Sequence, residues 1–283
     1  MNTQLTTLRD AIATHVRDGQ CIALEGFTHL IPFAAGHEIV RQGRRDLHLV
    51  RMTPDIVYDQ MIGMGCARKL TFSWGGNPGV GSLHRLRDAV EHQWPAALEI
   101  DEHTHAGMAA AYTAGAAHLP FGMLRGYLGT DLPQHNPRIR RIECPFTGEP
   151  LAAVPAINPD VAILHAQRAD RRGNVALHGI IGAQRECAFA ARTLVVTVEE
   201  IVDELPPAMN GVVLPHWMVA AVAHCPGGAY PSYVHDHYIR DNGFYQRWDA
   251  IAREREGFLA WMNRHVLGTA DHAGFLASLR EAA

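Results

Sequence analysis

A run of small residues directly behind two acids constrains the fold of this chain more than any other feature. Residues 98–102, LEIDE, alternate apolar and acidic side chains, which is typical of a strand that ends in Asp101 and Glu102. Residues 103–117 are mostly Ala, Gly and Thr, so they predict a helix with little side-chain bulk. Such a helix is buried, and it lets neighbouring backbones come close. The stretch therefore predicts a strand that ends in a carboxylate, followed by a tightly packed helix.

The position of Glu102 has both a functional and a structural interpretation. In open α/β sheets, ligands bind beyond the carboxyl ends of the strands, and a helix N-terminus keeps a nearby carboxylate ionised. An acid at this position could equally be only the N-cap of the helix that follows. The residues leave both interpretations open and make Glu102 the first candidate for a catalytic residue.

Composition and charge exclude several classes of protein. The 283 residues are 47% hydrophobic and 19% charged, as in an ordinary globular chain, and a formal net charge of -4 argues against a nucleic-acid-binding surface. We expect no membrane span, because no apolar run is long enough, and no signal peptide, because the N-terminus is polar. Five scattered cysteines without a CxxC pair fit a reducing cytoplasm. The 18 histidines show no HExxH spacing, so no metal site is expected.

Strand and helix patterns alternate along most of the chain. Strands are expected at 21–24, 47–50, 69–73, 98–102, 161–165 and 193–198, and helices at 5–16, 32–41, 55–63, 83–90, 103–117 and 183–191. Residues 235–283 predict further helices. This alternation predicts an α/β fold with an open, mostly parallel sheet and a helical C-terminal part. We expect one domain over 1–283, with the Pro-rich span 133–159 as a candidate subdomain seam.

Two glycine-rich loops each follow an expected strand and precede an expected helix. They are residues 26–29, GFTH, and residues 75–81, GGNPGVG. Backbone amides in such loops can hold an anion or serve as an oxyanion hole. Neither loop has the lysine of a P-loop or the GxGxxG spacing of a dinucleotide site, so plain glycine-rich turns remain the alternative. No serine lies in a GxSxG elbow. The residues alone predict an α/β enzyme-like domain with a carboxylate at a strand end.

Four segments resemble the alpha subunits of family I coenzyme A transferases, and within that family the alpha subunit of glutaconate CoA-transferase. These segments are EGFTHLIPFAAGHEIVRQGRRDL, KLTFSWGGNPGVGS, LEIDEHTHAGMAAAYTAGAAHLPFGMLRGYLGTDL and ECPFTGEPLAAVPAINPDVAILHAQRADRRGN. The most specific pieces are the GFT loop, LPF…GTDL and VPAxNPDVAIxHxQxADxxGN. The similarity extends from about residue 5 to about residue 228. It implies the open sheet that this family shares with sugar-phosphate isomerases.

The resemblance also implies a reaction and a partner. In this family a glutamate carboxylate attacks the acyl-CoA carbonyl, and CoA thiolate then converts the acyl-glutamyl anhydride into a glutamyl-CoA thioester. In two-chain members that glutamate belongs to the beta subunit, so an α2β2 hetero-oligomer is expected, with CoA as a substrate and without a permanently bound cofactor. This chain would then form the pocket for the acyl group or the acceptor acid. The candidate pocket residues are Gly26, Phe27, Thr28, Ser73, Gly75, Gly76 and Asn77.

Two alternatives accompany this interpretation. The chain also resembles the alpha subunits of CoA hydrolases that open steroid rings, whose catalytic glutamate corresponds to Glu102. Water would then replace the acceptor acid, with Glu102 as base or nucleophile. The same fold also occurs in sugar-responsive regulators, and a non-catalytic sensor or structural subunit is the second alternative. The chain shows no helix-turn-helix pattern and no basic stripe for binding DNA.

Overall fold

Eight parallel strands form the main path of the sheet in the computed structural model, which describes residues 3–78, 80–206 and 211–281. Their order is β1-β13-β11-β9-β2-β3-β4-β5. The bounds are β1 Gln4–Thr6, β2 Cys21–Leu24, β3 Leu47–Val50, β4 Ala67–Phe72, β5 Glu99–Glu102, β9 Val161–Asp170, β11 Thr193–Val202 and β13 Val219–His224. Two further strands, β10 (Val175–His178) and β12 (Gly211–Leu214), extend this sheet in antiparallel fashion from β9.

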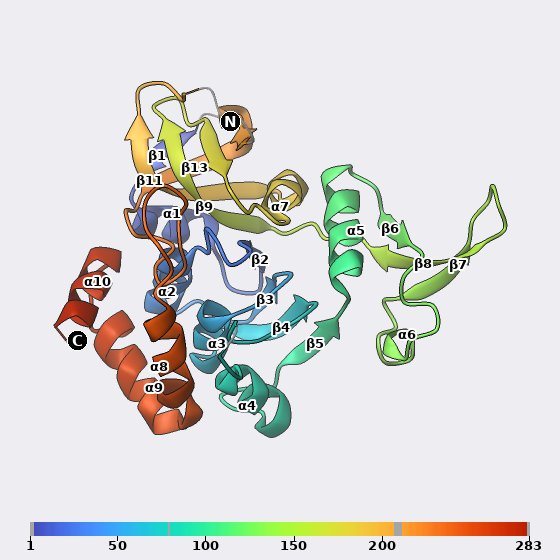
Figure 1. Cartoon of the computed structure of the whole chain (residues 1–283), viewed down its shortest axis with the longest axis horizontal. Helices are drawn as coiled ribbons and strands as arrows, with labels where there is room; N and C mark the ends of the chain where they lie inside the picture. The colour runs from blue at the N-terminus through green and yellow to red at the C-terminus, as the bar shows by residue number, and fades with distance from the viewer. Residues whose placement is uncertain (1–2, 79, 207–210, 282–283) are drawn as a thin grey trace.

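Helices cover both faces of the sheet, so the central strands are buried on both sides (Figure 1). In β2, Ile22 and Leu24 belong to one hydrophobic core, while Ala23 between them belongs to the other. The first core includes residues of α1 (Leu8–His15), α2 (Phe33–Arg41), α3 (Ile56–Gly63), α4 (His84–His92), α8 (Asn242–Arg253), α9 (Arg255–Met262) and α10 (His272–Arg280). The second includes residues of α5 (His105–Ala116) and α7 (Gln184–Ala190). Near-continuous apolar strands are what a doubly covered parallel sheet requires.

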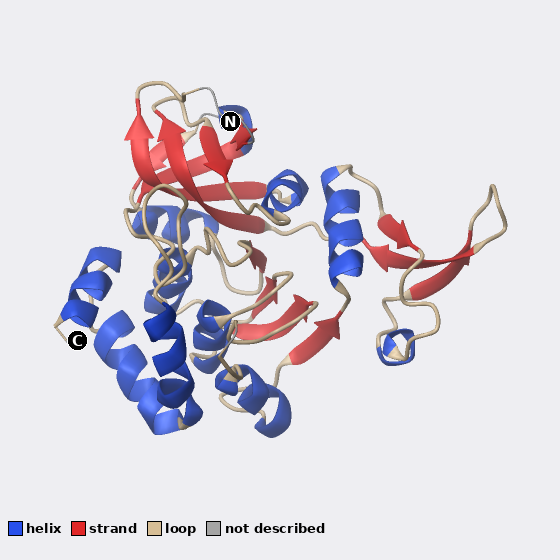
Figure 2. Cartoon of the chain, in the orientation of Figure 1, coloured by secondary structure: helices blue, strands red, loops and turns tan. Residues whose placement is uncertain are grey.

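A small antiparallel sheet lies beyond α5, away from the main sheet (Figure 2). Its order is β6-β8-β7, with β6 Phe121–Leu124, β7 Arg140–Glu143 and β8 Pro150–Pro155, and α6 (Leu132–His135) lies between β6 and β7. The small side chains of α5 allow the close contacts around it. A Cβ on Gly115 would lie 2.1 Å from the Ile157 carbonyl oxygen, and a Cβ on Gly122 would lie 2.5 Å from that of Ala110. The span 133–159 contains two strands of this sheet.

The predicted open, mostly parallel α/β sheet with a helical C-terminal part is confirmed. The helix expected over 5–16 is wrong at its start, because Gln4–Thr6 pair with β13 as an edge strand and the helix begins at Leu8. Thr7 caps that helix, since its side chain accepts a hydrogen bond from the Asp10 amide. The strands expected at 161–165 and 193–198 continue to Asp170 and Val202, because they pair with each other along this length. In the described part of the chain, no helix is both long and apolar enough to cross a membrane.

Candidate active site

The carboxyl ends of β2, β4 and β5 place three of the predicted stretches at the same edge of the sheet (Figure 1). His105, the first residue of α5, joins them. Its Nδ1 lies 3.3 Å from the Ser73 hydroxyl oxygen, and its ring meets the Phe27 ring edge-on with centroids 6.4 Å apart. The Ser73 hydroxyl donates to the Met52 carbonyl oxygen at 2.6 Å, so its proton is not directed at the imidazole. This arrangement does not activate Ser73 as a nucleophile.

Glu102 ends β5 with an exposed side chain. It lies in register with Phe72, whose ring is 3.6 Å from where a Cβ on Gly75 would be. Among the described residues, the Glu102 carboxylate makes no hydrogen bond and no ion pair, although its backbone carbonyl accepts from Asn136 Nδ2 at 2.7 Å. The N-cap of α5 is Thr104, whose hydroxyl accepts from the Gly107 amide at 3.0 Å. The N-cap interpretation of Glu102 is therefore wrong, and its carboxylate is free to contact a ligand.

The neighbouring acid, Asp101, has a different environment. It is buried, and its carboxylate contacts His103 Nε2 and Arg138 Nε at 3.0 Å each and accepts from Asn136 Nδ2 at 2.9 Å. Burial alone would raise the pKa of Asp101, but the hydrogen bonds from His103 and Asn136 and the charge of Arg138 outweigh it and hold the pKa below its usual range. Asp101 is thus an ionised anchor that binds β5 to the segment after α6.

The loop after β2 is held in an uncommon backbone conformation. Thr28 and Leu30 have φ values of 59° and 54°, in the left-handed region. A Cβ on Gly26 would lie 2.8 Å from the Leu30 carbonyl oxygen, so only glycine fits there. Within the described residues, the amides of Phe27 and Thr28 donate no hydrogen bond to the protein. Non-glycine residues in this region cost roughly 1–3 kcal/mol each and concentrate at functional sites. The two amides can therefore serve a ligand oxygen.

A buried polar network beneath this loop fixes its position. Arg51 donates to the Gly26 carbonyl oxygen at 2.8 Å and to Asp55 Oδ1 at 3.0 Å. Glu25 Oε1 accepts from the Met52 amide and from the Tyr112 hydroxyl, both at 2.8 Å. Burial raises the pKa of Glu25, although the nearby Arg51 charge and these hydrogen bonds oppose it. The network connects the ends of β2 and β3 to α3 and α5.

Sequence reasoning missed this network, although the sequence carries a signal for it. Glu25 directly follows the apolar strand 21–24, and Arg51 directly follows the apolar strand 47–50. Charged residues at equivalent positions after neighbouring parallel strands lie at the same sheet edge. His105 was also missed, because two histidines two residues apart did not suggest a common site.

The glycine loop after β4 is divided between the sheet edge and the C-terminal helices. Gly75 lies against Phe72 and Leu86, and Gly76 lies beneath the Trp74 ring. Asn77 is buried, and its side-chain amide donates to the Tyr245 carbonyl oxygen at 2.7 Å, which connects the turn to α8. Ser73 and Gly75 therefore border the edge that carries Glu102, while the side chain of Asn77 is used in a contact within the fold.

His29 holds the far end of the loop after β2. The residue is buried, and its Nε2 accepts from the His235 amide at 3.0 Å while its Nδ1 lies 3.1 Å from the Ile180 carbonyl oxygen. These partners require the neutral tautomer with the proton on Nδ1. Burial lowers the pKa of His29 to about 4. The imidazole is thus a neutral bridge between two other loops.

Comparisons with known proteins show which proteins this chain is similar to. A family model described as coenzyme A transferase matches residues 5–224. The chain is 64% identical to a subunit of 3-oxoadipate CoA-transferase from Pseudomonas knackmussii, over 98% of this chain and 99% of the relative. It is 28% identical to the cholesterol ring-cleaving hydrolase IpdA subunit of Rhodococcus jostii, over 94% and 92%. The crystal structure of glutaconate coenzyme A-transferase from Acidaminococcus fermentans superposes with a TM-score of 0.89 at 30% identity, covering 98% of this chain and 93% of that one.

The neutral state of His29 predicts a pH-dependent effect of its replacement. At pH 7, His29→Gln should lower the free energy of unfolding by about 1–3 kcal/mol, because two buried hydrogen bonds are disturbed. The folded-state pKa is about 4 and the unfolded-state value is near 6.5, so the unfolded parent binds the extra proton between these pH values. The parent therefore loses stability as pH falls from 6.5 towards 4, whereas glutamine does not titrate. Urea unfolding at several pH values should show that the difference in free energy of unfolding between the parent and His29→Gln becomes smaller as pH falls. A difference that stays constant with pH would contradict a buried neutral His29.

Proposed function

This chain belongs to the coenzyme A transferase family, and from that premise we propose that it is the alpha subunit of a two-chain enzyme that moves CoA from an acyl-CoA to 3-oxoadipate. The observation that carries the proposal is the 64% identity to a 3-oxoadipate CoA-transferase subunit, which extends over nearly the full length of both chains. Membership of this family supports an enzyme over the ligand sensor and the purely structural subunit that the fold alone allowed. CoA is then a substrate.

The proposed reaction conserves the thioester through a protein carboxylate. A glutamate of the beta subunit attacks the acyl-CoA carbonyl, which forms an acyl-glutamyl anhydride and releases CoA thiolate. The thiolate attacks the glutamyl carbonyl, which gives a glutamyl-CoA thioester and frees the first acid. The 3-oxoadipate carboxylate then attacks the glutamyl-CoA thioester, and the same two steps run in reverse with 3-oxoadipate as the acyl group. Each attack places negative charge on a carbonyl oxygen, and we propose that the amides of Phe27 and Thr28, which donate no hydrogen bond within the described residues, hold such an oxygen.

Two acids near this edge are fixed within the fold, and we propose that the nucleophile belongs to the partner. Glu25 is buried and accepts two hydrogen bonds, and Asp101 is held by His103, Asn136 and Arg138. Neither can leave its partners to attack a thioester. Glu102 is the exposed carboxylate at this edge, and we propose that it contacts the bound substrate beside Ser73 and Gly75. Phe27, with its ring against His105, forms the apolar side of the same pocket.

The hydrolase alternative assigns Glu102 a direct role in activating water. The chain is 28% identical to a cholesterol ring-cleaving hydrolase IpdA subunit, and this similarity supports hydrolysis as the alternative reaction. The 64% identity to a transferase subunit favours transfer to an acid. We therefore propose transfer as the reaction, with an α2β2 complex in the cytoplasm as its setting; the five free cysteine thiols suit that compartment.

Reconstitution tests the two-chain proposal. The purified chain alone, incubated with an acyl-CoA and 3-oxoadipate, should give no CoA transfer, because it supplies the pocket without the nucleophile. Addition of the beta subunit should restore transfer, measured by chromatographic separation of the two thioesters. The same complex without 3-oxoadipate controls for hydrolysis. Turnover by the lone chain at the rate of the complex would refute the proposal that the beta subunit supplies the nucleophile.

Replacement of Glu102 separates transferase from hydrolase chemistry. In the reconstituted complex, Glu102→Gln should leave the melting temperature within the error of the parent, because the carboxylate has no partner in the described fold. It should lower kcat/KM by about tenfold, mainly through KM, as expected for loss of one hydrogen bond to a charged group. A catalytic base or nucleophile would instead lose on the order of a hundredfold or more in kcat. A variant with parent kinetics would exclude Glu102 from the site.

A further inference from the structure

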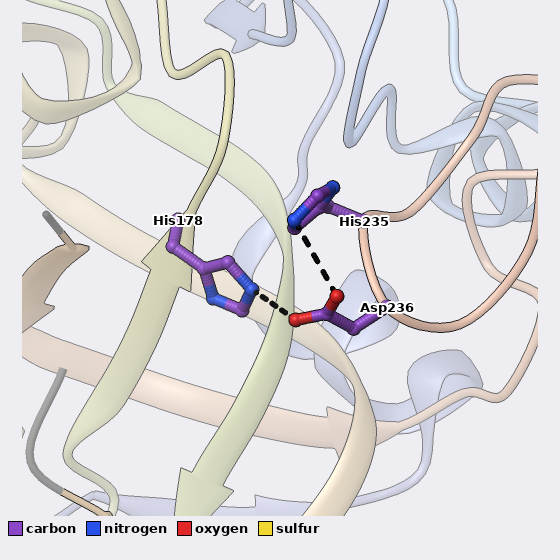
Figure 3. A group of neighbouring side chains, drawn as sticks. All are labelled: His178, His235 and Asp236. Atoms are coloured by element: carbon purple, nitrogen blue, oxygen red, sulfur yellow. Dashed lines mark hydrogen bonds and ion pairs between the residues drawn. The ribbon is translucent and has the colours of Figure 1, made fainter. Parts of the chain in front are cut away.

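Two imidazoles and a carboxylate converge on the surface between β10 and the loop that follows β13 (Figure 3). His178 is the last residue of β10, and its Nε2 lies 3.0 Å from Asp236 Oδ2. His235 Nε2 lies 3.4 Å from the other oxygen of the same carboxylate. One ligand atom from each of the three residues lies within 4.8 Å of the others. No local pattern predicts this cluster, since His178 and Asp236 are 58 residues apart.

We propose that His178, His235 and Asp236 form a binding site for a Zn²⁺ ion. Two imidazole nitrogens and one carboxylate oxygen are a common Zn²⁺ ligand set, with bonds of roughly 2.0–2.2 Å and water as the fourth ligand. At a tetrahedral centre with such bonds, ligand atoms are roughly 3.3 Å apart. Asp236 Oδ2 lies 3.0 Å from His178 Nε2 and Oδ1 lies 3.4 Å from His235 Nε2, so the carboxylate is close to both imidazoles and small side-chain rotations would bring one oxygen and both nitrogens to this spacing. The assignment of this site does not rest on the proposed transfer reaction.

Nearby hydrogen bonds fix the backbone positions of His178 and His235. Gln167 holds His178 from both sides, because its side chain accepts from the His178 amide at 3.2 Å and donates to the His178 carbonyl oxygen at 3.0 Å. His237 Nδ1 lies 3.2 Å from the His235 carbonyl oxygen. Asp236 has φ of 68°, in the left-handed region, and its carboxylate lies between the two rings (Figure 3). A site with ligands held in this way needs little rearrangement to bind an ion.

The ion would connect the two segments that hold His29. Ile180, two residues after His178, provides the carbonyl oxygen beside His29 Nδ1, and the His235 amide donates to His29 Nε2. A Cβ on Gly179 would lie 2.9 Å from His29 Cε1, which shows how closely this segment packs on the imidazole. An ion bound to His178 and His235 therefore clamps His29, and with it the loop 26–29. The inferred role is that of a structural staple.

Calorimetric titration of ZnCl₂ into the untagged full chain at pH 7.5, after treatment with a chelator, tests the site. The parent should bind one ion per chain, and His178→Ala and Asp236→Asn should each raise Kd at least tenfold, as loss of a ligand requires. Neither variant is expected to unfold, because Asp236 is exposed and His178 is only half-buried at the end of β10. His135→Ala is the matched control, an exposed histidine at the end of α6, and it should leave Kd unchanged.

Two further readouts connect binding to the loop. Zn²⁺ should raise the melting temperature of the parent and of His135→Ala but not of His178→Ala, because an ion that binds only the folded state stabilises it. Hydrogen exchange of peptides covering 26–29 should slow with Zn²⁺ in the parent but not in His178→Ala. Absence of saturable binding, or equal binding in the parent and in both ligand variants, would show adventitious surface binding only and would overturn the proposal.

Discussion

The buried guanidinium of Arg51 is the group on which the candidate site depends. Its charge is removed from water at the end of β3, and such burial is unfavourable unless the charge is paired. Asp55 supplies the opposite charge, and the Gly26 carbonyl oxygen accepts a further hydrogen bond. The guanidinium also lies 5.5 Å from the centroid of the Tyr58 ring. Because one of its partners is the loop backbone itself, this buried guanidinium also holds the loop after β2 in position.

Adjacent acids at the end of β5 show how the alternation of a strand assigns different roles to similar residues. Successive side chains of a strand point to opposite faces. Asp101 points to the face where Thr71, His103 and Asn136 satisfy it, and it stays ionised within the fold. The Glu102 side chain does not share that face. It is exposed to solvent at the end of β5, in register with Phe72 at the end of β4. The same chemical group is thus structural at one position and available to a ligand at the next.

Local patterns in the sequence were sufficient to predict the central part of the fold. The strands 21–24 and 47–50 coincide with β2 and β3, because short apolar runs bounded by Gly and charged residues leave few alternatives. The small-residue helix after Glu102 was predicted from its run of Ala, Gly and Thr. Its packing against Ile157 and the small sheet could not be derived, since contacts between segments far apart in the chain leave no local periodicity. The strands β6, β7 and β8 were missed for this reason, and their pairing partners lie across a Pro-rich span.

The candidate site, like the fold, could be predicted from the sequence only where local patterns decide it. Glu102 and the glycine loops could be placed at strand ends from the sequence, but the role of each side chain depends on neighbours from distant segments. Asn77 illustrates the point, because a Gly-Gly-Asn turn suggests a ligand loop while its amide contacts α8. His29 is a second case: its partners, Ile180 and His235, come from segments more than a hundred residues away in the chain.

The proposed role of Arg51, which is to position the loop after β2 for the reacting carbonyl, is tested most directly by the kinetics of one double variant. Arg51→Met with Asp55→Leu removes the buried charges together, and replacement of a buried pair by apolar side chains is often neutral for stability. The variant complex should therefore fold, with a melting temperature close to that of the parent. Its kcat/KM for CoA transfer should fall at least tenfold, because the Gly26 carbonyl loses its donor and the loop amides lose their orientation. A folded double variant with the kcat/KM of the parent would contradict this role of Arg51.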